Sequence, residues 1–319
     1  MVSVIIPAYN SEKSIGQCLK ALSEQSYPAD SYEVIVVDDG SIDNTPTIAQ
    51  DHTIQYIRQE NKGPAAARNN GAQKAKGDII LFTDSDCVPE AHWIREMVKS
   101  FEDSKVMAVK GAYRTRQNGL MARFAQVEFE ERFEMLKKVE NIDMVDTYSA
   151  GFRKEMFVDL GGFDTSFPVA NNEDTELSYR MSAQGYKMVF NPKAIVYHLS
   201  HPDSIAKYAR LKFWRGYWRM EVYRRFPNKM IKDTYTPQTL KFQILFLYLS
   251  LVILLLASFW PSLILLLFLG IISFGLLTLP FTIFAIKRDP AVGVLSAFFL
   301  LIRAASLGAG IIWAPLRKH

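Results

Sequence analysis

Residues 77–86 read GDIILFTDSD, an apolar run that leads directly into two carboxylates. The run at 79–82 is short and bounded by polar residues, as in a buried β-strand, and Asp84 and Asp86 follow where this strand should end. Two aspartates so placed often form no more than a turn. Carboxylates beside a buried strand are seldom left without a partner, however, so a positive charge is expected close to them.

The rest of the first 110 residues alternates strand and helix patterns around this stretch. Continuous apolar runs rich in β-branched residues are typical of parallel strands buried on both faces. Strands are predicted at 2–10, 32–41, 54–59 and 77–86, and helices at 14–25, 44–52 and 64–76. This order predicts an α/β fold with a Rossmann-like, mostly parallel, doubly wound sheet. Ligands of such sheets bind beyond the carboxyl ends of the strands, where the sequences PAYNSE, DDGS and TDSD should converge.

Acids that converge at one edge of a sheet favour a bound cation. Taken singly, Asp39 could be only the N-cap of the next helix. Taken together with Asp84 and Asp86, it predicts a pocket that holds Mg²⁺ or Mn²⁺, ions that bind through carboxylates and substrate phosphates. The region has neither a P-loop nor a G-x-G-x-x-G cradle, so a diphosphate would be met by the ion and by Arg68 or Lys62.

Five blocks of the chain, in order, resemble the family 2 glycosyltransferases with the GT-A fold: VSVIIPAYNSEKSIGQCLKAL, VIVVDDGSIDNT, NKGPAAARNNG, DSD and NNEDTEL. The resemblance covers roughly residues 1–200. It implies that a nucleotide sugar, a UDP- or GDP-sugar, is the donor and that transfer inverts the anomeric centre.

The resemblance also implies roles for individual residues. Asp39 matches the acid that reads the base, Arg68 the cation near the diphosphate, and 84–86 the D-x-D motif, with Asp86 as the preferred direct metal ligand. Together with Lys62 and the segment that contacts the nucleoside, the expected nucleotide-sugar site comprises Pro7, Ala8, Tyr9, Glu12, Asp39, Lys62, Arg68, Asp84 and Ser85.

A second acidic block, NNEDTELSYRM at 171–181, places Glu173, Asp174 and Glu176 at the start of a predicted helix. Acids in this position could merely favour the helix macrodipole. Inverting transfer to a hydroxyl needs a general base, however, and the resemblance makes Asp174 the preferred base, with Glu173 beside it. The acidic pair favours a hydroxyl acceptor over a polyprenyl phosphate, which is already ionised at neutral pH.

The stretch AIVYHLSHP at 194–202 places His198 at a strand end and His201 just after it. A single histidine here could be structural. Some relatives in the family complete the metal site with a histidine in this position, so His198 is a candidate metal ligand with Asp84 and Asp86 and is preferred over His201.

The C-terminal part of the chain is strongly apolar. Residues 242–260 and 262–286 carry no charge, and each is long enough to cross a hydrocarbon core of about 30 Å as a helix. A third stretch, 291–314, is apolar apart from Arg303. Buried helices of a soluble core are the alternative, but nothing polar remains to cover them. A transmembrane region is therefore predicted over 242–314, with the third stretch open between a span and a re-entrant or tilted helix.

Charge is distributed unevenly before this region. Residues 1–202 have an excess of seven acidic residues, and residues 203–241 an excess of seven basic ones. Four apolar residues of this basic linker share one helical face, and four cations flank it: Leu211, Trp214, Trp218 and Val222, with Arg210, Lys212, Arg215 and Arg219. The linker is therefore predicted to lie in the membrane interface, attracted by anionic lipid, rather than to bind nucleic acid.

Orientation follows from the same charges. The basic linker and Lys287–Arg288 belong on the cytoplasmic side, together with the catalytic domain. The basic RKH at 317–319 would contradict this pattern if the third stretch spanned fully. No signal peptide is expected ahead of the first strand, and two cysteines, Cys18 and Cys87, fit a reducing cytosol.

The sequence thus predicts a GT-A domain at 1–202, an interfacial linker at 203–241 and about three transmembrane helices, in an enzyme of cell-envelope or glycan biosynthesis that acts on a lipid-linked or membrane-proximal acceptor. KFWRGYWR at 212–219 lacks the Gln of the Q-x-x-R-W motif of processive synthases, which favours a non-processive enzyme. The alternatives are a polyprenyl-phosphate sugar synthase and a non-catalytic partner that binds nucleotide sugar. A nucleotidyltransferase would need a Gly- and Arg-rich first loop.

Overall fold

The computed structural model describes residues 1–167 and 171–316, which form two compact units. The first, the sheet unit, comprises Met1–Arg116 and Met135–Ser200. The second, the helical unit, comprises Gln117–Glu134 and the described residues from His201 onward. The RKH segment used above for orientation lies outside the described residues.

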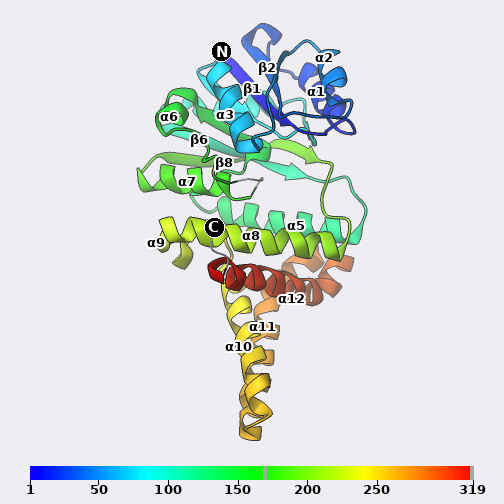
Figure 1. Cartoon of the computed structure of the whole chain (residues 1–319), viewed down its shortest axis with the longest axis vertical. Coiled ribbons are helices and arrows are strands. Elements are labelled where there is room, and N and C mark those ends of the chain that lie inside the picture. Colours follow the sequence, from blue (N-terminus) through cyan, green and yellow to red (C-terminus); the bar gives the residue numbers. More distant parts are fainter. Residues whose placement is uncertain (168–170, 317–319) are drawn as a thin grey trace. The chain divides into compact units, whose positions relative to one another are not determined.

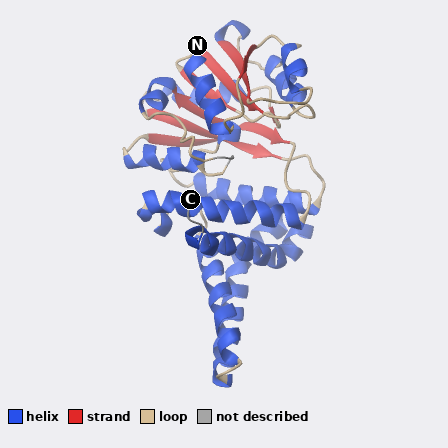
Figure 2. Cartoon of the chain, viewed as in Figure 1, coloured by secondary structure: helices blue, strands red, loops and turns tan. Residues whose placement is uncertain are grey.

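The sheet unit is built on a mixed sheet of eight strands within the described residues, in the order β3-β2-β1-β4-β7-β6-β8-β5 (Figures 1 and 2). The strands are β1 (Val2–Ala8), β2 (Tyr32–Asp38), β3 (Gln55–Arg58), β4 (Ile79–Phe82), β5 (Cys87–Pro89), β6 (Val106–Arg114), β7 (Ala150–Arg153) and β8 (Lys187–His198). The first four strands pair in parallel, as the sequence predicts. Beyond β4 the sheet becomes mixed, because β7 is antiparallel to both β4 and β6 and β5 is antiparallel to β8.

Helices and short 3-10 turns connect these strands. They are α1 (Ile15–Ser23), η1 (Ala29–Ser31), α2 (Thr45–Gln50), α3 (Pro64–Lys74), α4 (Trp93–Lys99), η2 (Ser100–Glu102), η3 (Thr147–Ser149), α6 (Lys154–Asp159) and α7 (Glu173–Ala183). The predicted helices at 14–25, 44–52 and 64–76 are confirmed as α1, α2 and α3.

Close packing of α3 on the sheet depends on Gly71. A Cβ atom at this position would lie 2.4 Å from Cγ2 of Ile5 on β1, so only glycine lets the helix approach this far. Helix α3 carries Arg68, and its depth against β1 therefore sets the position of that side chain relative to the strand ends.

The helical unit begins with α5 (Leu120–Leu136) and continues with α8 (Ile205–Arg225), α9 (Pro227–Ile231), α10 (Gln238–Ala257), η4 (Pro261–Leu263), α11 (Ile264–Arg288), α12 (Pro290–Trp313) and η5 (Ala314–Leu316). The domain boundaries predicted from the sequence placed residues 117–134 in the first domain, 1–202. In the structure this segment belongs to the helical unit, because Met121, Phe124 and Val127 of α5 pack in one apolar core with residues of α8, α11 and α12.

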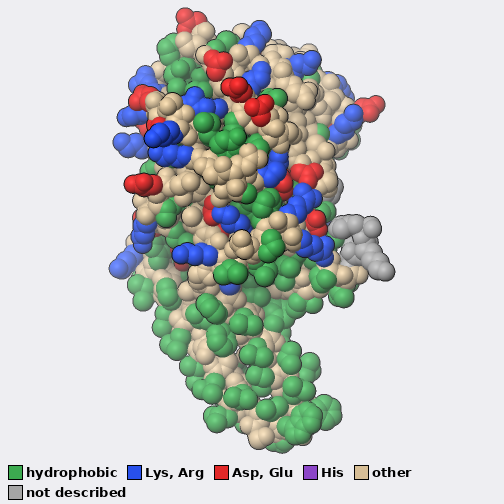
Figure 3. Space-filling model, turned by 90° about the vertical axis from the view of Figure 1, so that its left-hand side faces the viewer, with side chains coloured by type: hydrophobic (Ala, Val, Ile, Leu, Met, Phe, Trp, Pro, Cys, Tyr) green, Lys and Arg blue, Asp and Glu red, His purple; other side chains and the backbone are tan. Residues whose placement is uncertain are grey.

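Three helices of this unit are long and apolar enough to cross a membrane by length and composition: Gln238–Ala257, Pro261–Arg288 and Pro290–Leu316. The chain breaks between α11 and α12 at Asp289, whose side chain caps α12 by accepting a hydrogen bond from the Val292 amide at 3.2 Å. The surface of α10 and α11 is almost wholly apolar (Figure 3).

One expectation for the basic linker is wrong in detail. Lys212 was expected among the cations that flank the apolar face and meet anionic lipid, but only 3% of it is exposed, and its Nζ lies 2.9 Å from Oε2 of Glu128. The helical periodicity of the linker could not predict this burial, because the partner of Lys212 lies on another helix, α5.

Candidate active site

The carboxyl ends of the parallel strands bring the predicted site residues to one edge of the sheet. Ala8 at the end of β1 and Asp38 at the end of β2 are paired residues, and the Asp39 amide donates a hydrogen bond to the Ala8 carbonyl at 2.8 Å. Ser11 Oγ, in the loop after β1, lies 2.8 Å from Ser85 Oγ, in the loop after β4. The loops of three strands thus meet, as the sequence predicts.

Asp39 is held by donors from the loop before α3. Its carboxylate accepts hydrogen bonds from Gln59 Nε2 at 2.7 Å, the Lys62 amide at 2.9 Å and the Gly63 amide at 2.8 Å. An ionised carboxylate has about four acceptor positions, so one remains for a donor from a ligand. Asp39 is 4% exposed, and the network fixes its orientation.

The remaining residues predicted for the nucleoside lie beside Asp39. Pro7 and Ala8 belong to β1, whereas the side chain of Tyr9 just beyond it is 49% exposed. Glu12 is oriented by Asn44, whose backbone amide and side-chain amide both donate to Glu12 Oε2, at 3.1 and 3.2 Å. The Lys62 side chain is exposed.

Arg68 links the D-x-D motif to the second acidic block. It donates from one terminal nitrogen to Asp84 Oδ1 at 2.8 Å and from the other to Glu173 Oε1 at 2.9 Å. Arg68 is 2% exposed. The positive charge expected beside Asp84 is therefore Arg68, which uses two of the five N–H donors of its guanidinium in these bonds.

The electrostatics of this bridge are asymmetric. Burial opposes the charge of Arg68, but Asp84 and Glu173 outweigh it and raise the pKa of the guanidinium. Burial, together with the neighbouring Asp174, raises the pKa of the Glu173 carboxyl to about 7, against the effect of Arg68. Glu173 is therefore harder to ionise than an exposed glutamate.

Asp86, Cys87 and His198 form a group that could hold a metal ion, with their ligand atoms all within 4.8 Å of one another. The His198 Nε2 lies 3.8 Å from Asp86 Oδ2, because Cys87 on β5 pairs directly with His198 on β8. Burial, followed by the charges of Asp84 and Asp86, raises the pKa of the Cys87 thiol well above its usual range, so Cys87 is a neutral neighbour. The carboxylate suits Mn²⁺ or Mg²⁺, whereas the imidazole is a ligand of transition metals rather than of Mg²⁺, so the pair favours Mn²⁺.

Sequence reasoning missed two parts of this group. Cys87 was considered only as a redox marker, and Tyr113 of β6, whose ring centroid lies 5.6 Å from that of His198, was not considered. The almost continuous apolar run of β6 could have marked Tyr113 as buried, but nothing in the sequence reports the pairing of β5 with β8.

Asp174 lies in the first turn of α7 and is only partly buried. Its Oδ1 accepts a hydrogen bond from the Thr175 amide at 2.7 Å. Glu176, the third acid of the block, is instead engaged with Arg180, which donates from Nε at 2.9 Å and from a terminal nitrogen at 2.7 Å. Asp174 is therefore the acid of this block most open to a ligand.

His201 belongs to the helical unit, where its ring lies against that of Phe129 with the centroids 6.5 Å apart. It is not a member of the Asp86 group.

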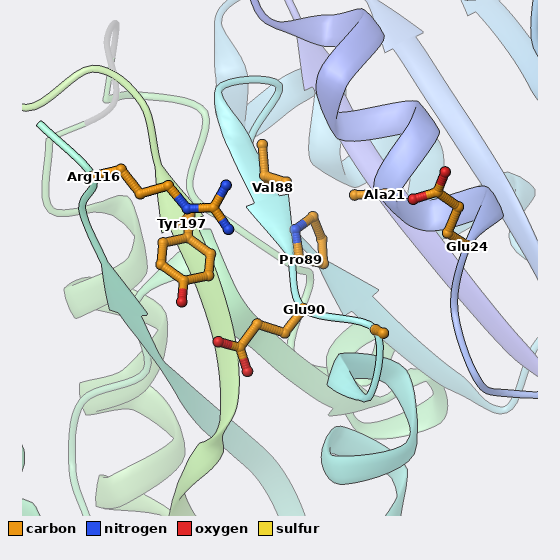
Figure 4. A pocket seen from close by; sticks show the side chains of 8 residues that line it. Ala21, Glu24, Val88, Pro89, Glu90, Arg116 and Tyr197 are labelled. Carbon is orange, nitrogen blue, oxygen red and sulfur yellow. The ribbon is translucent and has the colours of Figure 1, made fainter.

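A pocket of about 290 Å³ lies beside the β5–β8 pair and is lined by residues of α1, β5 and β8 (Figure 4). Side chains alternate along a strand, so Val88 and Tyr197, which line it, point away from Cys87 and His198. Arg116 covers the ring of Tyr197 at 4.1 Å from its centroid. The pocket is separate from the acidic edge.

A parallel half-sheet with a D-x-D motif at its carboxyl edge, continued by antiparallel strands, defines the class of GT-A glycosyltransferases. Residues 3–161 match the model of the family described as "Glycosyl transferase family 2", and the chain belongs to this family. It is 32% identical over 208 residues to "Glycosyltransferase AglE" of Haloferax volcanii, covering 63% of this chain and 67% of the relative.

Two further similarities agree. "Probable glycosyltransferase YdaM" of Bacillus subtilis is 32% identical over 241 residues, which cover 69% of this chain and 53% of that protein, so the chain spans about half of this relative. The solved mannosyltransferase PcManGT of Pyrobaculum calidifontis superposes with a TM-score of 0.63 at 22% identity and covers 100% of this chain and 88% of that chain. This last similarity establishes the fold alone.

Proposed function

We propose that the protein is an inverting, metal-dependent glycosyltransferase that moves a sugar from a UDP- or GDP-sugar to a hydroxyl of a lipid-linked or membrane-proximal acceptor. The observation that carries the proposal is the approach of His198 to Asp86 next to an Asp84 that Arg68 already orients. The neighbour PcManGT was solved in complex with GDP-Man and Mn²⁺, which supports a nucleotide-sugar donor and a divalent ion here.

Each residue has a part in the proposed reaction. Asp39 accepts a hydrogen bond from the nucleobase. Asp86 and His198 would hold the ion, which when bound would neutralise charge on the diphosphate. Asp174 accepts the proton of the acceptor hydroxyl while the oxygen of that hydroxyl attacks the anomeric carbon of the donor sugar. The bond from that carbon to the diphosphate breaks on the opposite face, and the diphosphate leaves with the electron pair.

The membrane part supports a membrane-proximal acceptor. We place the sheet unit in the cytoplasm, where nucleotide sugars are made, on the basis of the basic linker and Lys287–Arg288. A reporter fused to the N-terminus should be accessible only from the cytoplasmic face. Exclusive accessibility from the other face would contradict this orientation.

The experiment that tests the activity is a screen of the detergent-solubilised full chain against a panel of nucleotide sugars, with release of nucleoside diphosphate as the readout. We expect one UDP- or GDP-sugar to be turned over in the presence of Mn²⁺ or Mg²⁺, and transfer to hydroxyl acceptors in single additions. Binding of a nucleotide sugar without turnover on any acceptor would instead identify a non-catalytic partner. Transfer only to polyprenyl phosphate would identify a polyprenyl-phosphate sugar synthase.

A further inference from the structure

The third apolar helix of the helical unit, α12, is joined to polar helices along its whole length. At its start, Asp289 accepts two hydrogen bonds from Arg123 of α5, from Nε at 2.7 Å and from a terminal nitrogen at 2.6 Å. Arg288, immediately before, donates to Glu134 of the same helix at 3.0 Å. The beginning of α12 therefore lies against α5.

The middle of α12 is held by a buried ion pair. Arg303 donates to Glu128 of α5 at 3.1 Å, and each side chain is 1% exposed. Arg303 also donates to Gln243 Oε1 at 2.9 Å. Lys212 of α8 shares Glu128, so one carboxylate joins α5, α8 and α12.

The last turns of α12 pack against α8 through glycines. A Cβ atom at Gly310 would lie 2.0 Å from the Phe213 carbonyl oxygen, and one at Gly216 would lie 2.3 Å from the Leu307 carbonyl oxygen. The two backbones are therefore in direct contact. The start, the middle and the end of α12 all lie against α5 and α8, and Figure 1 shows α12 running across the direction of α10.

This arrangement is incompatible with a membrane span. A helix of 24 residues is about 36 Å long, and a span would place its middle at the centre of the bilayer. The middle of α12 instead contacts Glu128 of α5, a helix that also carries Glu130, Glu131 and Arg132. Each such charge costs about 2.5–3.5 kcal/mol at the bilayer centre on insertion scales, so α5 cannot lie at that depth.

The face of α12 turned away from these helices is apolar and exposed. Val294, Phe298 and Leu301, spaced as neighbours on one helical face, are 77%, 52% and 40% exposed. In the most apolar stretch of α12, 39% of the residues are buried inside the protein. The corresponding share is 11% for each of the other two candidate spans. One side of α12 thus belongs to the protein, and the other needs an apolar partner.

We propose that α12 is an in-plane helix, with the Val294–Phe298–Leu301 stripe inserted at the boundary between lipid head groups and acyl chains, and that the described chain crosses the bilayer only with α10 and α11. Lipid is the occupant that fits, because α11 is covered with exposed apolar side chains and leads into α12 after a break at a single residue, Asp289. An apolar stripe opposite a charged face is the pattern of helices that lie in the interface.

A labelling experiment on sealed vesicles tests the crossing. The native Cys18 and Cys87 are buried, so single exposed cysteines can be introduced for labelling. The variants are Asn228→Cys before α10, Ser258→Cys between α10 and α11, and Leu316→Cys after α12. With a membrane-impermeant maleimide, Leu316→Cys should react from the same side as Asn228→Cys and from the opposite side to Ser258→Cys. Reaction of Leu316→Cys on the side of Ser258→Cys would show that α12 spans and would overturn the proposal.

A depth measurement tests the occupant of the stripe and needs no enzyme activity. An environment-sensitive fluorophore at Val294→Cys, Phe298→Cys or Leu301→Cys should be quenched equally, and best by lipids that carry a nitroxide near the head group. The same label at Leu276→Cys, an exposed position in the middle of α11, should be quenched best by a nitroxide near the end of the acyl chain. A depth that increases steadily along α12, or no quenching by either lipid, would overturn the proposal, the latter in favour of a protein partner.

Discussion

Cys87 and His198 are paired residues of the antiparallel strands β5 and β8, and this pairing brings the His198 imidazole to 3.8 Å from the Asp86 carboxylate. The second aspartate of the D-x-D motif and the end of the last strand thus form one cluster. The same register pairs Val88 with Tyr197 and Pro89 with Val196.

The first prediction concerns the metal ion. Asp86→Ala removes a carboxylate ligand, so turnover should fall to background, and wild-type turnover should vanish with EDTA and return with Mn²⁺ or Mg²⁺. His198→Ala should raise the Mn²⁺ concentration needed for half-maximal binding, measured by electron paramagnetic resonance of free Mn²⁺. His92→Ala, an exposed histidine of the same unit, is the matched control. Full turnover in metal-free enzyme would contradict the assignment.

The second prediction is a pH dependence of stability caused by Glu173. Burial raises the pKa of Glu173 from 4.5, the ordinary value of a glutamate, to about 7 in the folded protein, so the folded state binds the proton more tightly than the unfolded state. The contribution of Glu173 to stability is therefore present below pH 4.5 and is lost as the pH rises towards 7.

Glu173→Gln should remove this dependence. Between pH 5 and pH 8 the melting temperature of the wild type should fall relative to that of Glu173→Gln, both measured in detergent. The exposed Glu155→Gln controls for the loss of one negative charge. A constant difference between wild type and Glu173→Gln over this range would show that Glu173 stays ionised beside Arg68.

The sequence predicts the parts of the site that depend on local pattern. Asp39 and Asp84 follow continuous apolar runs, which are typical of parallel strands. Neighbouring parallel strands must end at the same edge of the sheet. The helix that begins at Glu173 was likewise predicted from its acids.

The parts that depend on distant partners could not be predicted. Arg68 and Glu173 are 105 residues apart in sequence, and neither residue carries a local sign of the other. The same holds for Lys212, which helical periodicity places beside the apolar face of the linker, whereas its partner Glu128 lies on α5. The mixed half of the sheet was missed for the same reason, because antiparallel pairing of β7 with β4 is a property of the chain's path and not of either strand.

A third prediction concerns the buried Glu128 in the helical unit. Burial opposes its ionisation, but the charges of Lys212, Arg303 and Arg132 outweigh this effect and lower its pKa far below the usual value. Glu128→Ala leaves these buried cations without their carboxylate, which should cost about 3–5 kcal/mol of unfolding free energy in detergent.

The matched control is Glu130→Ala on the same helix. Glu130 is partly exposed and lies 3.8 Å from Arg288, so its loss should cost about 0–1 kcal/mol. Equal costs for the two variants would mean that water reaches the Glu128 cluster.

A fourth prediction tests the contact between α8 and α12. Gly310→Ala would place a Cβ atom 2.0 Å from the Phe213 carbonyl oxygen, so the two helices must separate, and the melting temperature should fall by several degrees. Gly275→Ala in α11 is the control, because nothing lies within 4 Å of its Cβ position. An unchanged melting temperature for Gly310→Ala would show that α12 moves away from α8 at no cost.

The last prediction separates chemistry from binding at Asp174. Asp174→Asn keeps the shape of the side chain but cannot take up the proton of an acceptor hydroxyl. Because general-base catalysis contributes about 10²–10⁴-fold, kcat should fall by this order while donor affinity stays close to that of the wild type. If Asp174 only stabilised the start of α7, the melting temperature would fall and each folded molecule would retain its turnover. A polyprenyl phosphate acceptor would attack through its own oxyanion, and the substitution would be mild. Single-turnover transfer by folded, donor-saturated Asp174→Asn protein decides between these cases: a rate within a few-fold of the wild type would remove Asp174 as the base.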